Sequence, residues 1–274
     1  MIFPSIGRAA ALALLSIPVL SSATAAELGA QSLSNGTYRA VEPPGWDGKS
    51  RLPLLLYLHG YGQSSAYVLG DQPLVAAATG SGALLVAPDG LDGSWAHIGS
   101  PSQGRDDIRF LRDVVADVRK RWPIDEHRIV AAGFSQGGSM VWDLACHASE
   151  GFAAFLPISG DFWLPYPARC ESGPVNLRHI HGMNDNTVPM GGRTIRGRFT
   201  QGDIGRSMAI LQQTDACRSE VDRVAVVGEL KCWTWPSCGS GRQLELCLHG
   251  DGHIMNAAWL SDGLDWAAGL PTQP

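Results

Sequence analysis

The chain has 274 residues, of which 45% are hydrophobic and 17% are charged, a composition typical of a globular protein with ample material for one large core. The formal net charge of −5 gives no reason to expect a nucleic-acid partner. The length allows two domains, although α/β folds of this size are often single.

The first residues of the chain match a secretory signal peptide rather than part of the fold. Arg8 is the only charge before Glu27, and an apolar run over residues 9–20 leads to Ala23-Thr24-Ala25, which fits a small-x-small cleavage site. Because such a run is too short to span a bilayer, we expect a cleaved leader over residues 1–26, with an uncleaved N-terminal anchor as the alternative. No second long apolar run follows, so we expect a secreted protein, extracellular or periplasmic, without a membrane span in its mature form.

Short apolar runs alternate with helical patterns along the rest of the chain. An edge strand is predicted at 36–41, buried strands at 52–58, 83–87, 128–132, 153–158 and 175–181, and further strands at 221–227, 230–235 and 244–248. Helices are predicted at 74–79, 106–121, 138–146, 207–216 and 254–266. The helix at 106–121 has Asp106 and Asp107 at its positive end and Lys120 and Arg121 at its negative end. This alternation predicts a single α/β domain over residues 27–274, with a mostly parallel sheet and helices on both faces.

The stretch Gly133-Phe134-Ser135-Gln136-Gly137 lies between a predicted strand and a predicted helix. Strand, G-x-S-x-G and helix in this order are typical of a nucleophile elbow. Gly133 and Gly137 would remove Cβ atoms that clash in so tight a turn, and Ser135 could then take a strained conformation with its hydroxyl exposed. A glycine-rich turn with an ordinary serine is the alternative.

A serine hydroxyl is a weak nucleophile and needs an adjacent base, usually a histidine oriented by a carboxylate. With this elbow the chain order is Ser, acid, His. His253 is the predicted base because it follows the strand at 244–248 through the flexible loop Gly250-Asp251-Gly252. His249 is the alternative base, whereas His179 and His181 alternate on one predicted strand, which favours a hydrogen-bonded role in the core.

The acid is expected in a loop after a late strand. Asp185 fits this place because it follows the strand at 175–181, and it is the predicted acid. Asp161, after the strand at 153–158, is the rival, although a turn role after Gly160 would also explain it.

Two backbone N–H groups are predicted to stabilise negative charge on a substrate carbonyl oxygen. The first belongs to Gln136, directly after the predicted nucleophile, and the second to Tyr61, in the loop after the strand at 52–58. A plain tight turn is the alternative for the Gly-rich stretch His59-Gly60-Tyr61-Gly62.

Six cysteines follow the expected leader, an even number that suggests disulfides. Four of them lie between residues 217 and 247, so this region is expected to be cross-linked to itself, which would leave Cys146 to pair with Cys170. A zinc site is the alternative, although the spacing of Cys232 and Cys238 matches zinc ligands poorly. We expect no metal ion and no cofactor.

Aromatic and basic side chains supply candidate substrate contacts. Trp95, Trp163 and Trp233 fall in or near predicted loops and could stack on an aryl or sugar group, although packing would also explain them. Four arginines could attract an anionic group or could form a solvated face: Arg193, Arg196, Arg198 and Arg206.

Several stretches together resemble a known family of secreted esterases. They are residues 54–63, residues 106–111, Arg128-Ile129 before Gly133-Phe134-Ser135-Gln136-Gly137-Gly138, and His179-Ile180-His181-Gly182 leading to Asp185, Val188 and Pro189. Over residues 36–260 the chain resembles the family that includes polyhydroxybutyrate depolymerase-like and feruloyl-esterase-like enzymes of the α/β-hydrolase fold. The resemblance implies Ser135 as nucleophile, Asp185 as acid and His253 as base. The stretch around His253, residues 250–255, lacks the glycine run and Trp-Pro that the family often has. We also expect no separate polymer-binding domain, which argues against attack on crystalline polyester.

These features predict a serine esterase that cleaves carboxylic esters through an acyl-enzyme intermediate. Polyhydroxyalkanoate oligomers or a related polyester are the expected substrate. The alternatives are a feruloyl or acetyl esterase acting on plant polysaccharides and a general carboxylesterase. A peptidase or acyltransferase with the same catalytic residues, and a non-catalytic binding protein on the same fold, are further alternatives.

Overall fold

The computed structural model describes residues 1, 25–218, 220–236, 238, 239 and 241–271. Ten of its strands form one sheet in the order β1-β2-β4-β3-β5-β6-β7-β12-β11-β10. The strands are β1 (Ala26–Leu33), β2 (Gly36–Glu42), β3 (Leu52–Leu58), β4 (Leu84–Pro88), β5 (Ile124–Phe134), β6 (Ala154–Ile158), β7 (Leu177–Gly182), β10 (Arg223–Val227), β11 (Leu230–Trp235) and β12 (Leu244–His249). A separate hairpin joins β8 (Arg193–Ile195) to β9 (Phe199–Gln201).

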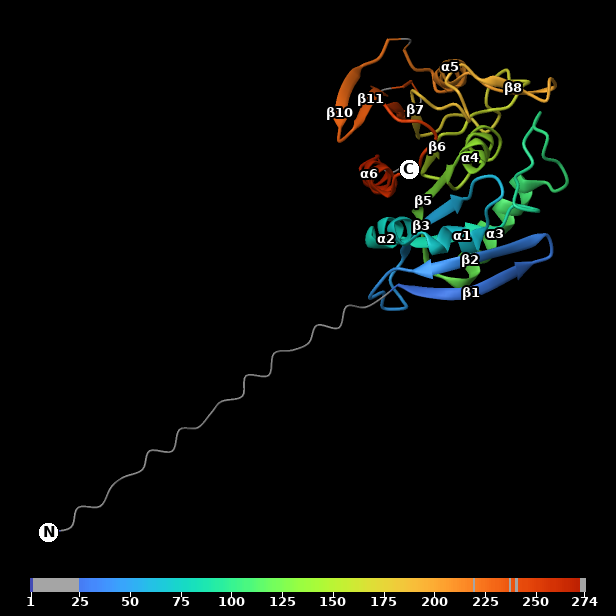
Figure 1. Ribbon diagram of the computed structural model, residues 1–274. Helices are drawn as coiled ribbons and strands as arrows, with labels where there is room; N and C mark the ends of the chain where they lie inside the picture. Colours follow the sequence, from blue (N-terminus) through green and yellow to red (C-terminus); the bar gives the residue numbers. More distant parts are fainter. Residues whose placement is uncertain (2–24, 219, 237, 240, 272–274) are drawn as a thin grey trace.

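The centre of the sheet is parallel and its two ends are antiparallel. Parallel pairing runs from β4 through β3, β5, β6 and β7 to β12. The blue strands β1 and β2 extend one end of the sheet, and the orange strands β10 and β11 extend the other (Figure 1). The prediction of a mostly parallel sheet is confirmed, but the strand at 36–41 is not at the edge, because β1 pairs with it.

Helices cover both faces of the sheet, as the continuous apolar strands require. The helices are α1 (Ser65–Gly70), α2 (Gln72–Gly80), α3 (Asp107–Arg121), α4 (Gln136–His147), α5 (Ile204–Thr214) and α6 (Ala257–Ala268). Alternate side chains of β3 point to opposite faces: Leu54, Leu56 and Leu58 pack in the core beneath α3, α4 and α5, whereas Leu55 and Tyr57 pack against α1, α2 and α6.

Capping side chains set where several helices begin. Asp106 accepts a hydrogen bond from the Arg109 N–H at the start of α3, whose last turn carries Arg119, Lys120 and Arg121, as its charge pattern predicts. Asp203 caps α5 and Asn256 caps α6. The predicted helix at 207–216 therefore begins earlier, at Ile204, and the predicted helix at 254–266 begins later, at Ala257.

The expected leader lies outside the described residues except for Met1, Ala25 and Ala26, and Ala26 already belongs to β1. In the described part of the chain, no helix is long and apolar enough to cross a membrane.

Three disulfides join the cysteines in pairs: Cys146–Cys170, Cys217–Cys238 and Cys232–Cys247. The expected division, with Cys146 paired to Cys170 and the four cysteines of residues 217–247 paired among themselves, is confirmed. The zinc alternative is wrong, because Cys232 and Cys238 belong to two different disulfides and neither keeps a thiolate to offer.

Candidate active site

Ser135 stands at the carboxyl end of β5, in the turn that leads into α4. Its backbone has φ 58° and ψ −120°, a region that residues other than glycine rarely adopt. A Cβ on Gly133 would lie 2.6 Å from the backbone of Gly137, and a Cβ on Gly137 would lie 2.0 Å from the carbonyl oxygen of Leu58. The two glycines therefore permit the tight turn that the sequence pattern predicts.

Two consecutive hydrogen bonds connect Ser135 to His253 and His253 to Asp185. Nε2 of His253 lies 2.9 Å from Oγ of Ser135, and Nδ1 of His253 lies 2.7 Å from Oδ2 of Asp185. These residues follow β5, β12 and β7, and they meet because the carboxyl ends of parallel strands lie at one edge of the sheet. Since a carboxylate can only accept, Nδ1 of His253 donates to Asp185, and Nε2 is left to accept the Ser135 proton.

The Asp185 carboxylate is held in place by its own loop. Its Oδ1 accepts hydrogen bonds of 2.8 Å from the backbone N–H groups of both Thr187 and Val188. Burial raises the pKa of Asp185, but the hydrogen bond from His253 and these backbone donors outweigh it and hold the pKa below its usual value. Asp185 is therefore ionised at neutral pH and can orient the imidazole of His253.

Asp161 and His249, the alternatives for the acid and the base, are buried away from the hydrogen bonds that join Ser135, His253 and Asp185. Asp161 is 1% exposed, and burial raises its pKa to about 7. Its backbone N–H donates to Oγ of Ser139, 3.0 Å away. His249 is buried, and its ring lies 4.2 Å from the ring of Trp259. Neither side chain hydrogen-bonds to His253 or Ser135 in the part of the chain that the structure describes.

Two further histidines form a buried pair behind Asp185. Nε2 of His181 lies 2.7 Å from the Val188 carbonyl oxygen and so donates to it. Nδ1 of His181 is then the acceptor for Nε2–H of His179, 3.0 Å away. Burial lowers the pKa of both histidines, which keeps them neutral. The sequence-based expectation of a hydrogen-bonded core role for this pair is confirmed.

The loop after β3 brings Tyr61 to the same cavity as Ser135 and Gln136. Gln136 is the first residue of α4, so its N–H has no partner within the helix. Among the hydrogen bonds of the described residues, none uses the backbone N–H of Tyr61. Among the described residues, neither predicted donor therefore has a hydrogen-bond partner within the protein.

His59 fixes the shape of the loop that carries Tyr61. Its Nε2 accepts a hydrogen bond from the Gly90 N–H at 2.9 Å, so its Nδ1 carries the proton and donates to the Gly60 carbonyl oxygen at 2.8 Å. Burial lowers the pKa of His59, which favours the neutral ring that this arrangement requires.

The side chain of Gln136 has a positioning role that the sequence pattern does not reveal. Its Oε1 lies 3.2 Å from the Trp95 N–H, and its Nε2 lies 3.1 Å from Oγ of Ser102 and 3.0 Å from Oγ of Ser94. These bonds join the start of α4 to the loop between β4 and α3. The G-x-S-x-G pattern leaves this position variable, so no signal in the sequence marks the contact.

A cavity of about 360 Å³ opens at Ser135. Tyr61, Trp163 and Ile195 supply apolar surface to it, and Arg193 and Arg196 supply charge. A second cavity, of about 320 Å³, reaches His253 and is lined by aromatic and apolar side chains that include Tyr67, Phe134 and Met255. One cavity thus lies at Ser135 and the other at His253.

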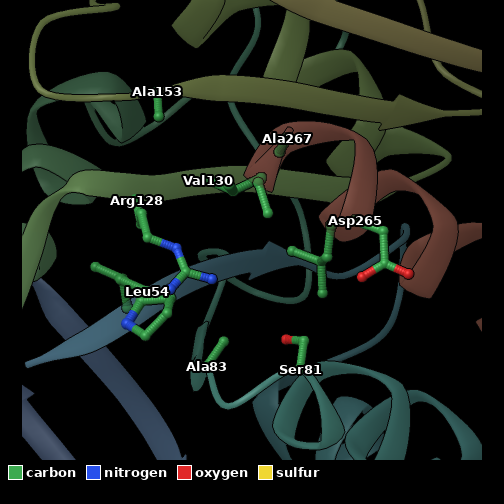
Figure 2. Close-up of a pocket in the computed structure, with 11 residues that line it drawn as sticks. Leu54, Ser81, Ala83, Arg128, Val130, Ala153, Asp265 and Ala267 are labelled. Carbon is green, nitrogen blue, oxygen red and sulfur yellow. The ribbon is translucent and has the colours of Figure 1, made fainter. Parts of the chain in front are cut away.

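A smaller hollow of about 80 Å³ lies far from this site, at the amino ends of β3 and β6 (Figure 2). Figure 2 shows Arg128 and Asp265 around it, on β5 and α6. This hollow lies at the edge of the sheet opposite to Ser135 and is therefore not part of the candidate active site.

The three tryptophans singled out from the sequence occupy different places. Trp163 lines the cavity at Ser135. The expectation that Trp95 contacts a substrate is wrong, because Trp95 is fully buried and its Nε1 donates to the His59 carbonyl oxygen. The expectation for Trp233 is also wrong, because this side chain lies on β11 beneath Lys231 and is not part of the cavity wall.

Known proteins resemble this chain in sequence and in fold. The family model described as Phospholipase/Carboxylesterase matches residues 107–204. A probable feruloyl esterase C of Aspergillus terreus is 31% identical over 193 residues, which are 65% of this chain and 68% of that protein. Feruloyl esterase C of Emericella nidulans is 32% identical over 180 residues, which are 62% of this chain and 63% of that protein. The chain thus spans about two thirds of the length of these relatives.

The solved structure of an acetyl xylan esterase from Aspergillus awamori superposes with a TM-score of 0.61 at 12% identity, covering 86% of this chain and 94% of that chain. At this identity the likeness shows a shared fold.

Proposed function

The chain belongs to the α/β-hydrolase carboxylesterases that include feruloyl esterase C, and we propose that it hydrolyses feruloyl or related esters of plant polysaccharides. The observation that carries this proposal is the pair of consecutive hydrogen bonds from Ser135 to His253 and from His253 to Asp185. Ser135 lines a cavity whose wall includes the aromatic side chain of Trp163, which suits an aryl group.

In the proposed acylation step, Oγ of Ser135 attacks the ester carbonyl carbon while its proton passes to Nε2 of His253. The negative charge on the carbonyl oxygen is stabilised by the N–H groups of Gln136 and Tyr61. The bond to the alcohol then breaks, and the alcohol oxygen leaves with the proton from His253. Asp185 stays ionised throughout and stabilises the imidazolium that forms.

Deacylation uses the same groups in reverse. Water gives a proton to Nε2 of His253 and attacks the acyl carbon on Ser135, and the proton then returns to Oγ as the acid leaves. Since Ser135, Gln136 and Tyr61 line one cavity, we place the scissile carbonyl there. The alcohol half leaves from the side that His253 reaches.

The relatives favour this substrate over the polyester that the sequence suggests. Both are named for feruloyl esters, and nothing in their names concerns polyhydroxyalkanoates. We therefore place feruloyl esters first, with acetylated saccharides next, and keep hydroxyalkanoate oligomers as a comparison in the assay.

We also propose that the protein is secreted as a single domain after loss of its leader. Three disulfides support this location, because such bonds persist in oxidising compartments.

The test is hydrolysis of methyl ferulate, an acetylated xylo-oligosaccharide and a 3-hydroxybutyrate trimer by the purified mature protein and by Ser135→Ala. We expect methyl ferulate to be cleaved with the highest kcat/KM, and Ser135→Ala to lose nearly all turnover with an unchanged circular dichroism spectrum. Preference for the trimer would restore the polyester interpretation. A Ser135→Ala variant that retained more than a few per cent of the rate would contradict the role of Ser135.

A further inference from the structure

The cavity at Ser135 has a positively charged wall. Arg193 and Arg196 come from the β8–β9 hairpin and line the same cavity as Ser135 and Trp163. The hairpin is attached to the chain after β6 by hydrogen bonds from the Leu164 N–H to the Thr200 carbonyl oxygen, at 2.8 Å, and from the Gly202 N–H to the Phe162 carbonyl oxygen, at 2.7 Å. The two arginines are therefore carried by a fixed part of the cavity wall.

No acidic side chain offsets this charge in the cavity. The lining contains no Asp and no Glu among the described residues. The guanidinium of Arg193 donates to neutral oxygens, Oε1 of Gln201 at 3.0 Å and the Asn186 carbonyl at 3.2 Å. Among the ion pairs of the described residues, none includes Arg193 or Arg196, although the whole chain has a net charge of −5.

The other two arginines of the cluster behave differently. The guanidinium of Arg198 lies 5.2 Å from the ring of Phe199, and that of Arg206 lies 4.5 Å from the ring of Tyr166. Neither lines the cavity at Ser135. The interpretation of a solvated face therefore suits Arg198 and Arg206, whereas Arg193 and Arg196 face the space that a substrate would occupy.

We propose that Arg193 and Arg196 bind a carboxylate carried by the ester substrate, and that they make the site selective for anionic esters. This inference rests on the proposed function. A planar guanidinium with free N–H donors pairs well with a carboxylate, and two of them in one cavity favour an anion over a neutral group of the same shape. The carboxylate could belong to the acyl half, as in a dicarboxylic half-ester, or to the alcohol half, as in a uronate-bearing saccharide.

The test compares esters that differ in charge but hardly in shape. For the acyl half, the pair is the 4-nitrophenyl half-ester of glutaric acid and the 4-nitrophenyl ester of glutaramic acid. For the alcohol half, the pair is carboxymethyl ferulate and carbamoylmethyl ferulate. We expect the anionic member of one pair to have a kcat/KM about 10-fold higher at low ionic strength, and this advantage to shrink in 0.5 M salt, where charges are screened beyond a few ångströms. The pair that responds identifies the half of the ester that carries the anion.

Arg196→Gln and Arg193→Gln test the residues, and Arg198→Gln is the matched control on the same hairpin. We expect the anionic-to-neutral ratio to fall about fivefold or more in the first two variants and to stay at the wild-type value in the control. Arg196→Gln is the cleaner variant, because Arg193 also supports the hairpin through Gln201. Equal rates within both pairs for the wild type, or the same ratio in Arg196→Gln and Arg198→Gln, would overturn the inference while leaving the esterase proposal intact.

Binding measurements test the anion site independently of whether the protein hydrolyses esters. Ser135→Ala should bind carboxymethyl ferulate or the glutaric half-ester more tightly than the matching amide in calorimetry, and the added change Arg196→Gln should abolish the difference. If no ester is turned over but this difference is present, the proposed function fails and the anion site stands. If the amide and the carboxylate bind equally in both pairs, the anion site is rejected.

Discussion

His181 donates a hydrogen bond from Nε2 to the carbonyl oxygen of Val188, at 2.7 Å. The N–H of the same Val188 donates to Oδ1 of Asp185 at 2.8 Å. The buried, neutral His181 thus positions Val188, and the N–H of Val188 in turn positions the carboxylate of Asp185, the proposed catalytic acid.

Replacement of His181 by phenylalanine should weaken catalysis through Asp185. The change leaves the buried Val188 carbonyl without its donor, which costs about 1–3 kcal/mol of stability. A displaced Val188 N–H would also support the Asp185 carboxylate less well, so the pKa of Asp185 should rise. We expect kcat to fall about 10-fold with little change in KM, and the acid limb of the kcat profile to move to higher pH.

Urea denaturation and a pH–rate profile on methyl ferulate separate the two effects of His181→Phe. A variant that lost stability but kept the wild-type kcat and pH profile would show that His181 serves only the core.

Asp185→Asn should reduce turnover severely, whereas Asp161→Asn should not. An amide in place of the Asp185 carboxylate can hold His253 in the wrong tautomer, with Nε2 protonated toward Ser135. In the serine protease that serves as the reference case for such triads, the equivalent change lowers kcat by about 10⁴. The measurement is kcat for both variants on one soluble ester at constant pH. Near-normal turnover by Asp185→Asn, with loss of turnover in Asp161→Asn, would move the acid role to Asp161.

Local patterns in the sequence are sufficient to predict strand β5 and the tight turn at Ser135. A buried parallel strand is apolar throughout, and a turn as tight as the one at Ser135 requires glycine, so both features leave a local signature. Asp185 and His253 follow from chain order and from the loops after β7 and β12. Their meeting with Ser135 depends on the parallel pairing of strands, which the alternation of elements predicts.

The parts that the sequence does not reveal depend on contacts between distant segments. β1 is mostly exposed and lacks a regular apolar alternation, and β8 and β9 are three residues each. Trp95 lies in a predicted loop, yet its ring packs 4.8 Å from that of His59, which comes from another loop. The cluster of four arginines is visible in the sequence. Only the fold of the β8–β9 hairpin shows that Arg193 and Arg196 line the cavity at Ser135, whereas Arg198 and Arg206 do not.

The mature protein should contain no free thiol, because all six cysteines are paired. Alkylation under denaturing, non-reducing conditions should therefore label none of them, and labelling after reduction should modify all. Peptide mapping of the unreduced protein should recover Cys217 linked to Cys238 and Cys232 linked to Cys247. Two or more cysteines that react before reduction would contradict the paired set.

The buried carboxyl of Asp161 should make the protein less stable as pH rises. Burial raises its pKa from 3.8 to about 7 in the folded state, whereas the unfolded chain restores the usual value. Between these two values the folded protein binds a proton that the unfolded chain has lost, so the contribution of Asp161 to the free energy of unfolding is complete below pH 3.8 and is lost as pH rises toward 7. Each unit of pKa difference corresponds to about 1.4 kcal/mol.

Asp161→Asn removes this titration while keeping a side chain of similar size. Urea denaturation at pH 4, 5, 6, 7 and 8 should show that the wild type loses more than about 1 kcal/mol relative to the variant across this range. The comparison with the variant is needed because Asp215, whose pKa burial also raises to about 7, changes stability in the same direction. The lowered pKa of Asp185 acts in the opposite direction, since its contribution is lost as pH falls. Parallel stability curves for the two proteins would show that Asp161 is ionised in the fold, and a curve for the variant that fell more steeply than that of the wild type would reverse the sign of its contribution.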